Sequence, residues 1–193
     1  MHESLINYIQ RHSAQSLSEA DIEFIKSVFI PKKIRKRQYF LQAGEVCKYS
    51  AFIVKGAMRQ YSVDEKGVEH VVRLSLEDWW VVDRESFTML IPSAFNIDAW
   101  EDTEVLLVSK ADSVELMKIP AFNEMARVLD DKHSFSSQKR INAFISQSAE
   151  QRYIDFLTTY PAFLQRFPQH LVASYLGITK ETLSRIRTQM VRK

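Results

Sequence analysis

One stretch near the C-terminus, residues 169–188, constrains the fold of this chain more than any other. Ala173 is small enough for two helices to cross there, and Gly177, four positions later, can adopt the positive φ of a tight turn. Thr179 can cap a second helix with its hydroxyl group. A shared apolar core would come from Val172, Leu176, Ile178, Leu183 and Ile186. The segment therefore predicts a helix-turn-helix.

The second helix of this motif would carry a polar face opposite its apolar stripe. At about 100° per residue, Leu183, Ile186 and Met190 fall on one side. The opposite side collects Glu181, Ser184, Arg185, Thr188 and Arg192. Arginine can donate two hydrogen bonds to guanine, glutamate can accept one from cytosine, and the N-terminal residues of such a helix reach base edges. We therefore predict DNA contacts by Lys180, Glu181, Thr182, Ser184, Arg185 and Arg187, with Arg187 at the flank of the helix and directed to phosphates.

The charge of the chain is divided unevenly. Residues 139–193 carry nine Lys and Arg against three Asp and Glu, a net charge of +6, whereas residues 1–138 carry seventeen against twenty-one, a net charge of −4. An acidic body with a basic end is typical of a protein whose end contacts a polyanion. Chance clustering on a solvated surface is the alternative interpretation.

Residues from about 29 to 109 show the pattern of short strands. Runs of β-branched and aromatic residues alternate with turn signals, and Gly44, Gly56 and Gly67 stand at three of these turns. Glycine permits the positive φ that such turns require. The expected strands are 39–41, 51–54, 57–63, 68–74, 96–100 and 105–108. Short strands at regular spacing predict an antiparallel β sandwich or barrel.

Helical patterns flank this region. Two amphipathic helices are expected in the first thirty residues, the second introduced by Ser18 with Asp21 as the acidic residue of a capping box. Between Pro120 and Tyr160 there is no glycine or proline. Apolar residues at three-four spacing predict one long helix over 120–148 and another over 149–160. The chain is thus expected to be an α+β protein with three parts, residues 1–118, 119–148 and 149–193.

At residues 180–185, Lys-Glu-Thr-Leu-Ser-Arg, the sequence resembles the recognition helix of the Crp/Fnr transcription regulators. Residues 41–45, 53–56 and the hairpin around Lys66-Gly67 are similar to the early strands and turns of the sensor domain in that family. The resemblance implies a jelly roll of the cyclic-nucleotide-binding type in residues 1–118, a dimerisation helix in 119–148 and a winged-helix-like DNA-binding domain in 149–193. It also implies a homodimer on a palindromic operator in double-stranded DNA, with RNA polymerase as a further partner.

The resemblance fails at the phosphate cassette. Family members that bind cyclic AMP have a Gly-Glu pair, followed by an Arg-Ser/Thr-Ala sequence whose arginine neutralises the phosphate. Here Val82 and Asp83 occupy the Gly-Glu places, Ser93 lies near the arginine place, and no arginine occurs between Arg84 and Arg127. A buried phosphate without a cation is unfavourable. We therefore predict that the sensor domain does not respond to cyclic AMP, and the sequence identifies no effector.

The sequence predicts neither a metal site nor a cofactor. A single cysteine, Cys47, excludes an iron–sulfur sensor of the type that needs several thiolates. His70 and His133 are the candidates for a haem ligand, and the plainer interpretation is an ordinary strand or helix histidine. A cupin-like metal-dependent enzyme, the main alternative class, needs two close histidines in the strand region, and the five histidines do not supply them. The prediction is therefore a protein that is not an enzyme.

Two further alternatives concern partners and location. A helix-turn-helix that no longer binds DNA could instead belong to a protein–protein adaptor. The basic run 32–37 is interpreted as a solvated strand and turn, with contact to DNA or to a partner as the alternative. No secretory signal pattern and no apolar run of about 20 residues is present, which predicts a cytoplasmic protein without membrane contact.

Overall fold

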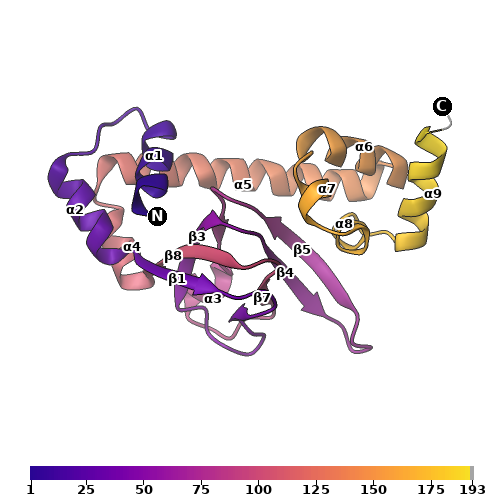
Figure 1. The fold of residues 1–193 in the computed structure, drawn as a ribbon, viewed down its shortest axis with the longest axis horizontal. Coiled ribbons are helices and arrows are strands. Elements are labelled where there is room, and N and C mark those ends of the chain that lie inside the picture. Colours follow the sequence, from indigo (N-terminus) through magenta and orange to yellow (C-terminus); the bar gives the residue numbers. More distant parts are fainter. Residues whose placement is uncertain (192–193) are drawn as a thin grey trace.

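The computed structural model describes residues 1–191 of the chain and combines helices with antiparallel strands (Figure 1). The helices are α1 (His2–Arg11), α2 (Glu19–Val28), α3 (Arg84–Met89), α4 (Lys110–Leu116), α5 (Pro120–Ser146), α6 (Ala149–Thr159), α7 (Phe163–Arg166), α8 (Gln169–Tyr175) and α9 (Lys180–Val191). The strands are β1 (Ile30–Ile34), β2 (Tyr39–Leu41), β3 (Tyr49–Lys55), β4 (Met58–Val63), β5 (Glu69–Ser75), β6 (Trp80–Val81), β7 (Asn96–Ala99) and β8 (Thr103–Ser109). The α+β expectation is confirmed.

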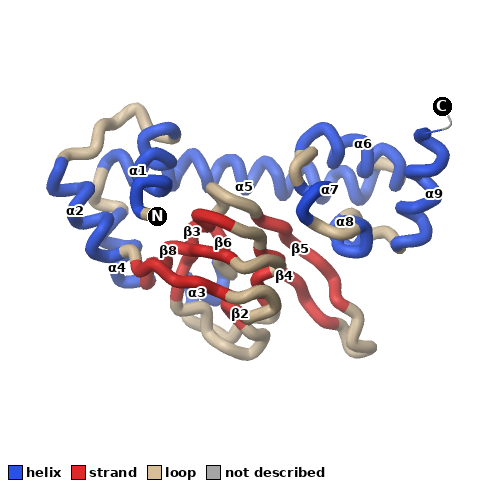
Figure 2. The backbone as a smooth tube through the Cα atoms, in the orientation of Figure 1, coloured by secondary structure: helices blue, strands red, loops and turns tan. Residues whose placement is uncertain are grey.

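Within residues 1–191 the strands form two four-stranded antiparallel sheets and no single closed barrel (Figure 2). One sheet has the order β1-β8-β3-β6 and the other β2-β7-β4-β5, which is the strand order of a double-sheet jelly roll. Gly56 turns β3 into β4 with φ +108°, and a Cβ atom there would lie 2.5 Å from the Thr103 hydroxyl oxygen, so this turn requires glycine.

Part of residues 80–89 lies outside the expected pattern. The sequence analysis did not anticipate β6 or α3, which together span only eight residues of Trp80–Met89. A two-residue strand and a six-residue helix are too short to show a period of their own. The N-terminal helices do follow expectation, because Ser18 and Asp21 form the reciprocal capping box at the start of α2.

The long helix α5 connects the two ends of the molecule. It begins with Pro120 at its first turn, where the missing N–H costs nothing, and runs for 27 residues. Its start packs with α1 and α2, and its far end lies beside the C-terminal helices (Figures 1 and 2). The helix expected over 120–148 is present and ends two residues earlier than expected, at Ser146.

Helices are the only regular secondary structure within residues 149–191. Four helices, α6 to α9, follow one another there, and no strand occurs among these residues. The expectation of a winged-helix-like domain is therefore wrong for residues 149–191, since a wing is a β-hairpin. The side chain of Arg192, which the sequence analysis placed on the outer face of α9, lies outside the described residues.

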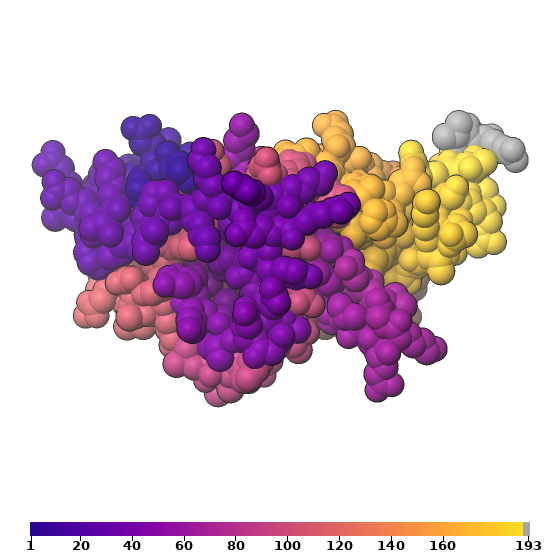
Figure 3. All heavy atoms as spheres, turned by 60° about the horizontal axis from the view of Figure 1, so that its bottom comes forward, coloured from indigo at the N-terminus to yellow at the C-terminus, as the bar shows by residue number. Residues whose placement is uncertain are grey.

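One apolar core joins the C-terminal helices to the second sheet. Tyr61, Val71 and Leu74 of the sheet share this core with Phe156, Phe163 and Leu171 of the helices. In the space-filling view the C-terminal helices pack against the strands and form one end of the molecule, while the β4–β5 turn projects from the body (Figure 3). No helix among residues 1–191 is long and apolar enough to cross a membrane.

Candidate nucleic-acid interface

Helices α8 and α9 are joined by the tight turn that the sequence predicts. Gly177 adopts φ +65°, and a Cβ atom at this position would lie 2.6 Å from the Phe144 ring of α5. The Ile178 N–H donates to the Ala173 carbonyl (3.0 Å), which closes the turn over the small side chain of Ala173. A glycine is therefore required here both for backbone conformation and for the close approach of α5.

The start of α9 is capped by Thr179. Its Oγ1 accepts a hydrogen bond from the Thr182 N–H (3.2 Å), as the sequence predicts. The Thr182 hydroxyl lies 3.1 Å from the same oxygen, so this side chain is directed back along the turn. Thr182, one of the six residues predicted to contact DNA, is only partly exposed and takes part in the cap.

The inner face of α9 is fixed by apolar packing. Leu183 and Ile186 are 1% and 5% exposed, and they pack in the same core as Val172 and Leu176 of α8 and Phe156 of α6. Burying an aliphatic side chain of this size stabilises by about 1.5–3 kcal/mol. The direction in which the opposite face of α9 points is therefore set by the fold and not by its own polar residues.

The outer face of α9 forms a shallow surface hollow. It is lined by Lys180, Glu181, Ser184, Arg185, Thr188 and Gln189. Four of the six predicted contact residues lie together here, namely Lys180, Glu181, Ser184 and Arg185. Arg187 is exposed but does not line the hollow, in agreement with its predicted position at the flank. Gln189 was missed by the sequence analysis, although its amide can read adenine.

The charged groups of this face are available for a ligand. Within residues 1–191, no carboxylate lies within 4 Å of the Lys180, Arg185 or Arg187 side-chain nitrogens. The pKa of Glu181 is lowered by its own backbone N–H and then by the Thr179 hydroxyl, so its carboxylate is charged at neutral pH. The face thus offers unpaired cations beside one hydrogen-bond-accepting anion.

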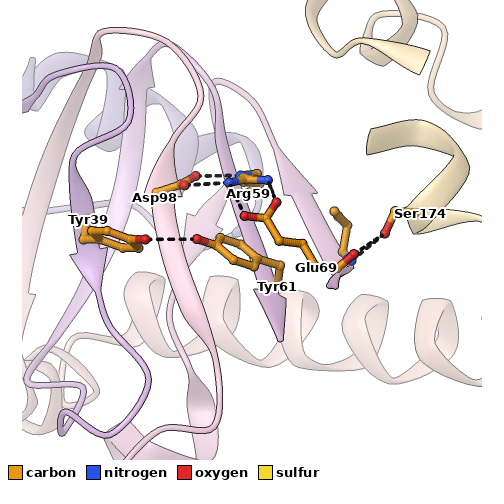
Figure 4. Close-up of polar contacts among 7 residues, drawn as sticks. Tyr39, Arg59, Tyr61, Glu69, Asp98 and Ser174 are labelled. Carbon is orange, nitrogen blue, oxygen red and sulfur yellow. Dashed lines mark hydrogen bonds and ion pairs between the residues drawn. The ribbon is translucent and has the colours of Figure 1, made fainter. Parts of the chain in front are cut away.

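Polar contacts hold α8 against the sheet (Figure 4). The Ser174 hydroxyl accepts from the Val71 N–H (2.9 Å) and donates to the Glu69 carbonyl (3.2 Å), so it bonds to the outer edge of β5. The Glu69 side chain in turn binds Arg59, which forms a two-pronged pair with the buried carboxylate of Asp98 (2.9 Å for each bond). These partners are far apart in the sequence, and no local pattern indicates them.

A second polar attachment involves α7. Arg166 donates to Glu77 (3.0 Å) and to Glu101 (2.7 Å), which lie in the turns that follow β5 and β7. Trp79 of the first turn packs on Phe163 of the same short helix. The C-terminal helices are therefore docked on the strand region by both ion pairs and rings.

The stretch that the sequence analysis compares with the phosphate cassette is filled by the chain's own polar groups. The buried Asp83 caps α3 and accepts a hydrogen bond from the Ser93 hydroxyl (2.6 Å). Ser86 accepts from the Cys47 N–H (2.8 Å) and donates to the Ile91 carbonyl. Asp83 and Ser93, which the sequence analysis compares with the glutamate and arginine of the cassette, thus bind each other.

The two histidines considered as haem ligands have other partners. His70 is exposed and pairs with Asp64 (2.9 Å), and His133 contacts Arg73. Among residues 1–191 no group of three or more His, Cys, Asp or Glu side chains could hold a metal ion.

The sequence matches no family model and no curated protein. Its structure is similar to that of FixK2 from Bradyrhizobium japonicum, with a TM-score of 0.71 at 20% identity over 86% of this chain and 85% of that one. It is also similar to the catabolite activator protein of Thermus thermophilus (TM-score 0.57, 17% identity, 92% and 85% covered). A protein from Eubacterium rectale described as a Crp/Fnr-family regulator gives a TM-score of 0.66 at 17% identity, with 91% and 85% covered. The resemblance drawn from residues 180–185 is thus confirmed at the level of architecture: the chain has the fold of the Crp/Fnr transcription regulators.

Proposed function

We propose that this protein is a sequence-specific DNA-binding transcription regulator whose α8 and α9 form a helix-turn-helix. The observation that carries this proposal is the outer face of α9, where Lys180, Ser184 and Arg185 are exposed without acidic partners among residues 1–191. Leu183 and Ile186 anchor the inner side of α9 in the apolar core, so the helix can enter the major groove with its outer face toward the bases. The proposal places the protein in the cytoplasm, with RNA polymerase as a further partner.

The active form we propose is a homodimer. The second half of α5 exposes Phe135, Ile141 and Ile145, which a second copy of α5 would cover. Two recognition helices related by a two-fold axis match a palindromic operator with half-sites about one helical turn, ~10 bp, apart. In this proposal residues 1–118 are the sensor domain, 119–148 the dimerisation helix and 149–193 the DNA-binding domain.

Cyclic AMP is not the effector in this proposal. A cyclic phosphate at the cassette would meet the buried carboxylate of Asp83 in place of an arginine, and it would have to break the bond between Asp83 and Ser93. Burying an unpaired charge costs several kcal/mol. We expect calorimetry with 1 mM cyclic AMP or cyclic GMP to show no binding, and operator affinity to stay unchanged. A micromolar dissociation constant for either nucleotide would contradict this part of the proposal.

The DNA-binding proposal is tested by replacing Arg185 with alanine. If Arg185 contacts a guanine, Arg185→Ala should weaken binding to the operator by about 1–3 kcal/mol and relax the preference at one base pair of each half-site. The operator would first be selected from random DNA, and affinity measured at several salt concentrations. Arg187→Ala should weaken binding to all sequences alike and lower the salt dependence.

The matched control is Arg127→Ala, which removes an exposed arginine from α5, away from α9. It should leave affinity unchanged. If Arg185→Ala binds DNA as tightly and as selectively as wild type, α9 is not the helix that reads the bases. A chain that binds no DNA at any salt concentration would favour the adaptor alternative.

A further inference from the structure

Guanidinium groups gather where β5, α5 and the C-terminal helices meet. Nη2 of Arg73, on β5, lies 2.6 Å from Nδ1 of His133 on α5. Arg140, two turns further along α5, donates to the Val72 carbonyl of β5 and to the Tyr175 carbonyl of α8 (3.1 Å). Each of these side chains is partly buried. The cluster therefore touches the sensor region, the long helix and the C-terminal helices at once.

These arginines lack counter-ions. Among residues 1–191, neither Arg73 nor Arg140 has a carboxylate within 4 Å of its guanidinium nitrogens. A third arginine, Arg84, lies close enough to repel Arg73 and pairs with Asp130 (2.7 Å), which is the one carboxylate bound in the cluster among the residues that the structure describes. Two partly buried positive charges are thus left without compensation, an arrangement that proteins ordinarily avoid.

The remaining polar groups of the cluster do not supply negative charge. Burial, and then the positive charges of Arg73 and Arg84, lower the pKa of His133 to about 4 against the opposing effect of Asp130, so its ring is neutral at pH 7. The Tyr175 ring packs beneath the Arg140 guanidinium, 4.1 Å from ring centroid to carbon. Burial first, and the neighbouring Tyr175, raise the pKa of Tyr160, so that phenol keeps its proton. Apart from Asp130, which pairs with Arg84, the described residues of the cluster offer hydrogen-bond donors and positive charge without an anion to receive them.

We propose that Arg73, His133 and Arg140 form a binding site for a small dianion, of the charge and shape of a phosphate monoester, between β5 and α5. Arginine matches a phosphate group with its planar pair of N–H donors. Two uncompensated guanidinium groups fit a dianion better than the single charge of a cyclic phosphate. The site is separate from the Asp83–Ser93 pair, where a carboxylate would repel any anion.

The position of the site suggests what the anion does. Arg140 bonds to main-chain carbonyls of both β5 and α8, so an anion that draws this side chain toward Arg73 would change the docking of α8 on the sheet. Because α8 precedes the reading helix α9, we assign the anion the role of effector. That role rests on the proposed function, whereas binding of the anion can be measured without DNA.

The test uses inorganic phosphate as the probe and the full chain. At pH 7.5, phosphate should bind with a saturable heat, measured against sodium chloride at equal ionic strength. Arg73→Gln should weaken phosphate binding at least tenfold, and Arg73→Lys, which keeps the charge but loses the planar pair of donors, should weaken it by a smaller factor. The matched control Arg127→Gln removes an exposed arginine of α5 and should change binding less than twofold.

A second measurement follows His133 directly. Because a bound anion favours the charged ring, a saturating dianion should raise the pKa of His133, followed by NMR, well above about 4. The probe here is sulfate, which is still a dianion at this pH, whereas inorganic phosphate carries a single charge. If Arg73→Gln does not fold, the lysine variant and this titration decide. Equal phosphate binding by wild type and Arg73→Gln, or a His133 titration that sulfate leaves unchanged, overturns the site. A wild-type chain that binds phosphate but binds no DNA would instead overturn the proposed function.

Discussion

The two halves of helix α5 differ in what covers them. In the first half, Ala121, Phe122 and Met125 are at most 5% exposed and share a core with α1, α2 and the first sheet. In the second half, Phe135, Ile141 and Ile145 are 58%, 60% and 81% exposed. Both halves belong to one uninterrupted run of helical hydrogen bonds.

This difference shows that the backbone of α5 and its packing have separate causes. A helix without internal glycine or proline continues by adding one hydrogen bond per residue, whether or not its apolar side chains find partners. The apolar side chains of the first half pack against other parts of the same chain. The second half is attached to its own chain through polar groups, such as Arg140 on the Val72 carbonyl, and directs apolar residues outward. An outward apolar stripe of this kind is typical of a surface that another molecule covers.

The largest effect is expected for Ile145→Gln. Burial of an aliphatic side chain contributes about 1.5–3 kcal/mol, and a two-fold interface buries it twice, so the dimer dissociation constant should rise by about 10²–10⁴-fold. Analytical ultracentrifugation over a range of concentrations measures this change. Lys139→Gln, an exposed polar position on the same half of α5, is the control and should leave the constant unchanged. A wild-type chain that stays monomeric at micromolar concentration, with and without DNA, would show that no second copy covers the second half of α5.

A slightly smaller effect is expected in the first half. Phe122 is 5% exposed and packs near the Phe29 and Trp80 rings, so Phe122→Ala should lower the free energy of unfolding by about 3–5 kcal/mol. Urea unfolding of the monomeric Ile145→Gln variant would measure it without a contribution from association. In that background Phe135→Ala should lower the free energy of unfolding by less than about 0.5 kcal/mol, since Phe135 is 58% exposed. Equal costs for the two phenylalanines would mean that the halves are not distinct.

The smallest effect concerns the polar attachment of α7. Although burial raises the pKa of Glu77, the hydrogen bond from Arg166, and then that from the Gly56 N–H, hold it below its ordinary 4.5. A carboxyl with a lowered pKa stabilises the folded state above its unfolded pKa, and this contribution is lost as the pH falls through the folded pKa.

Arg166→Gln should therefore reduce stability at pH 7 by less than about 1 kcal/mol, because these groups are about a third exposed, and the reduction should shrink below pH 4.5. Denaturant unfolding between pH 3 and pH 7 measures the difference. Arg11→Gln, which removes an exposed pair with Asp78, is the control and should show little change at any pH. A loss from Arg166→Gln that did not depend on pH would point to packing as its cause.

Much of the fold follows from local sequence signals, and the contacts between its parts do not. Ala173, Gly177 and Thr179 each have a local reason for their place, so the turn before α9 could be predicted. The absence of strands in residues 149–191 could not, because the family resemblance, and not a pattern in those residues, suggested a wing.

Long-range polar pairs are hidden from a sequence for a different reason. Arg166 meets Glu77 across 89 positions, and Arg73 meets His133 across 60. Each partner alone reads as an ordinary surface residue. Only the docking of the C-terminal helices on the second sheet brings such pairs together, and that docking depends on the shape of a shared core.

The bond between Ser174 and β5 bears on the solubility of this protein. β5 is the outermost strand of its sheet, so its free N–H and carbonyl groups could pair with a strand of another molecule. Ser174 occupies two of these groups, on Val71 and Glu69, and α8 covers the strand beside them. The C-terminal helices therefore shield a potential aggregation edge, and a chain truncated before α8 would leave that edge open to strand-to-strand association.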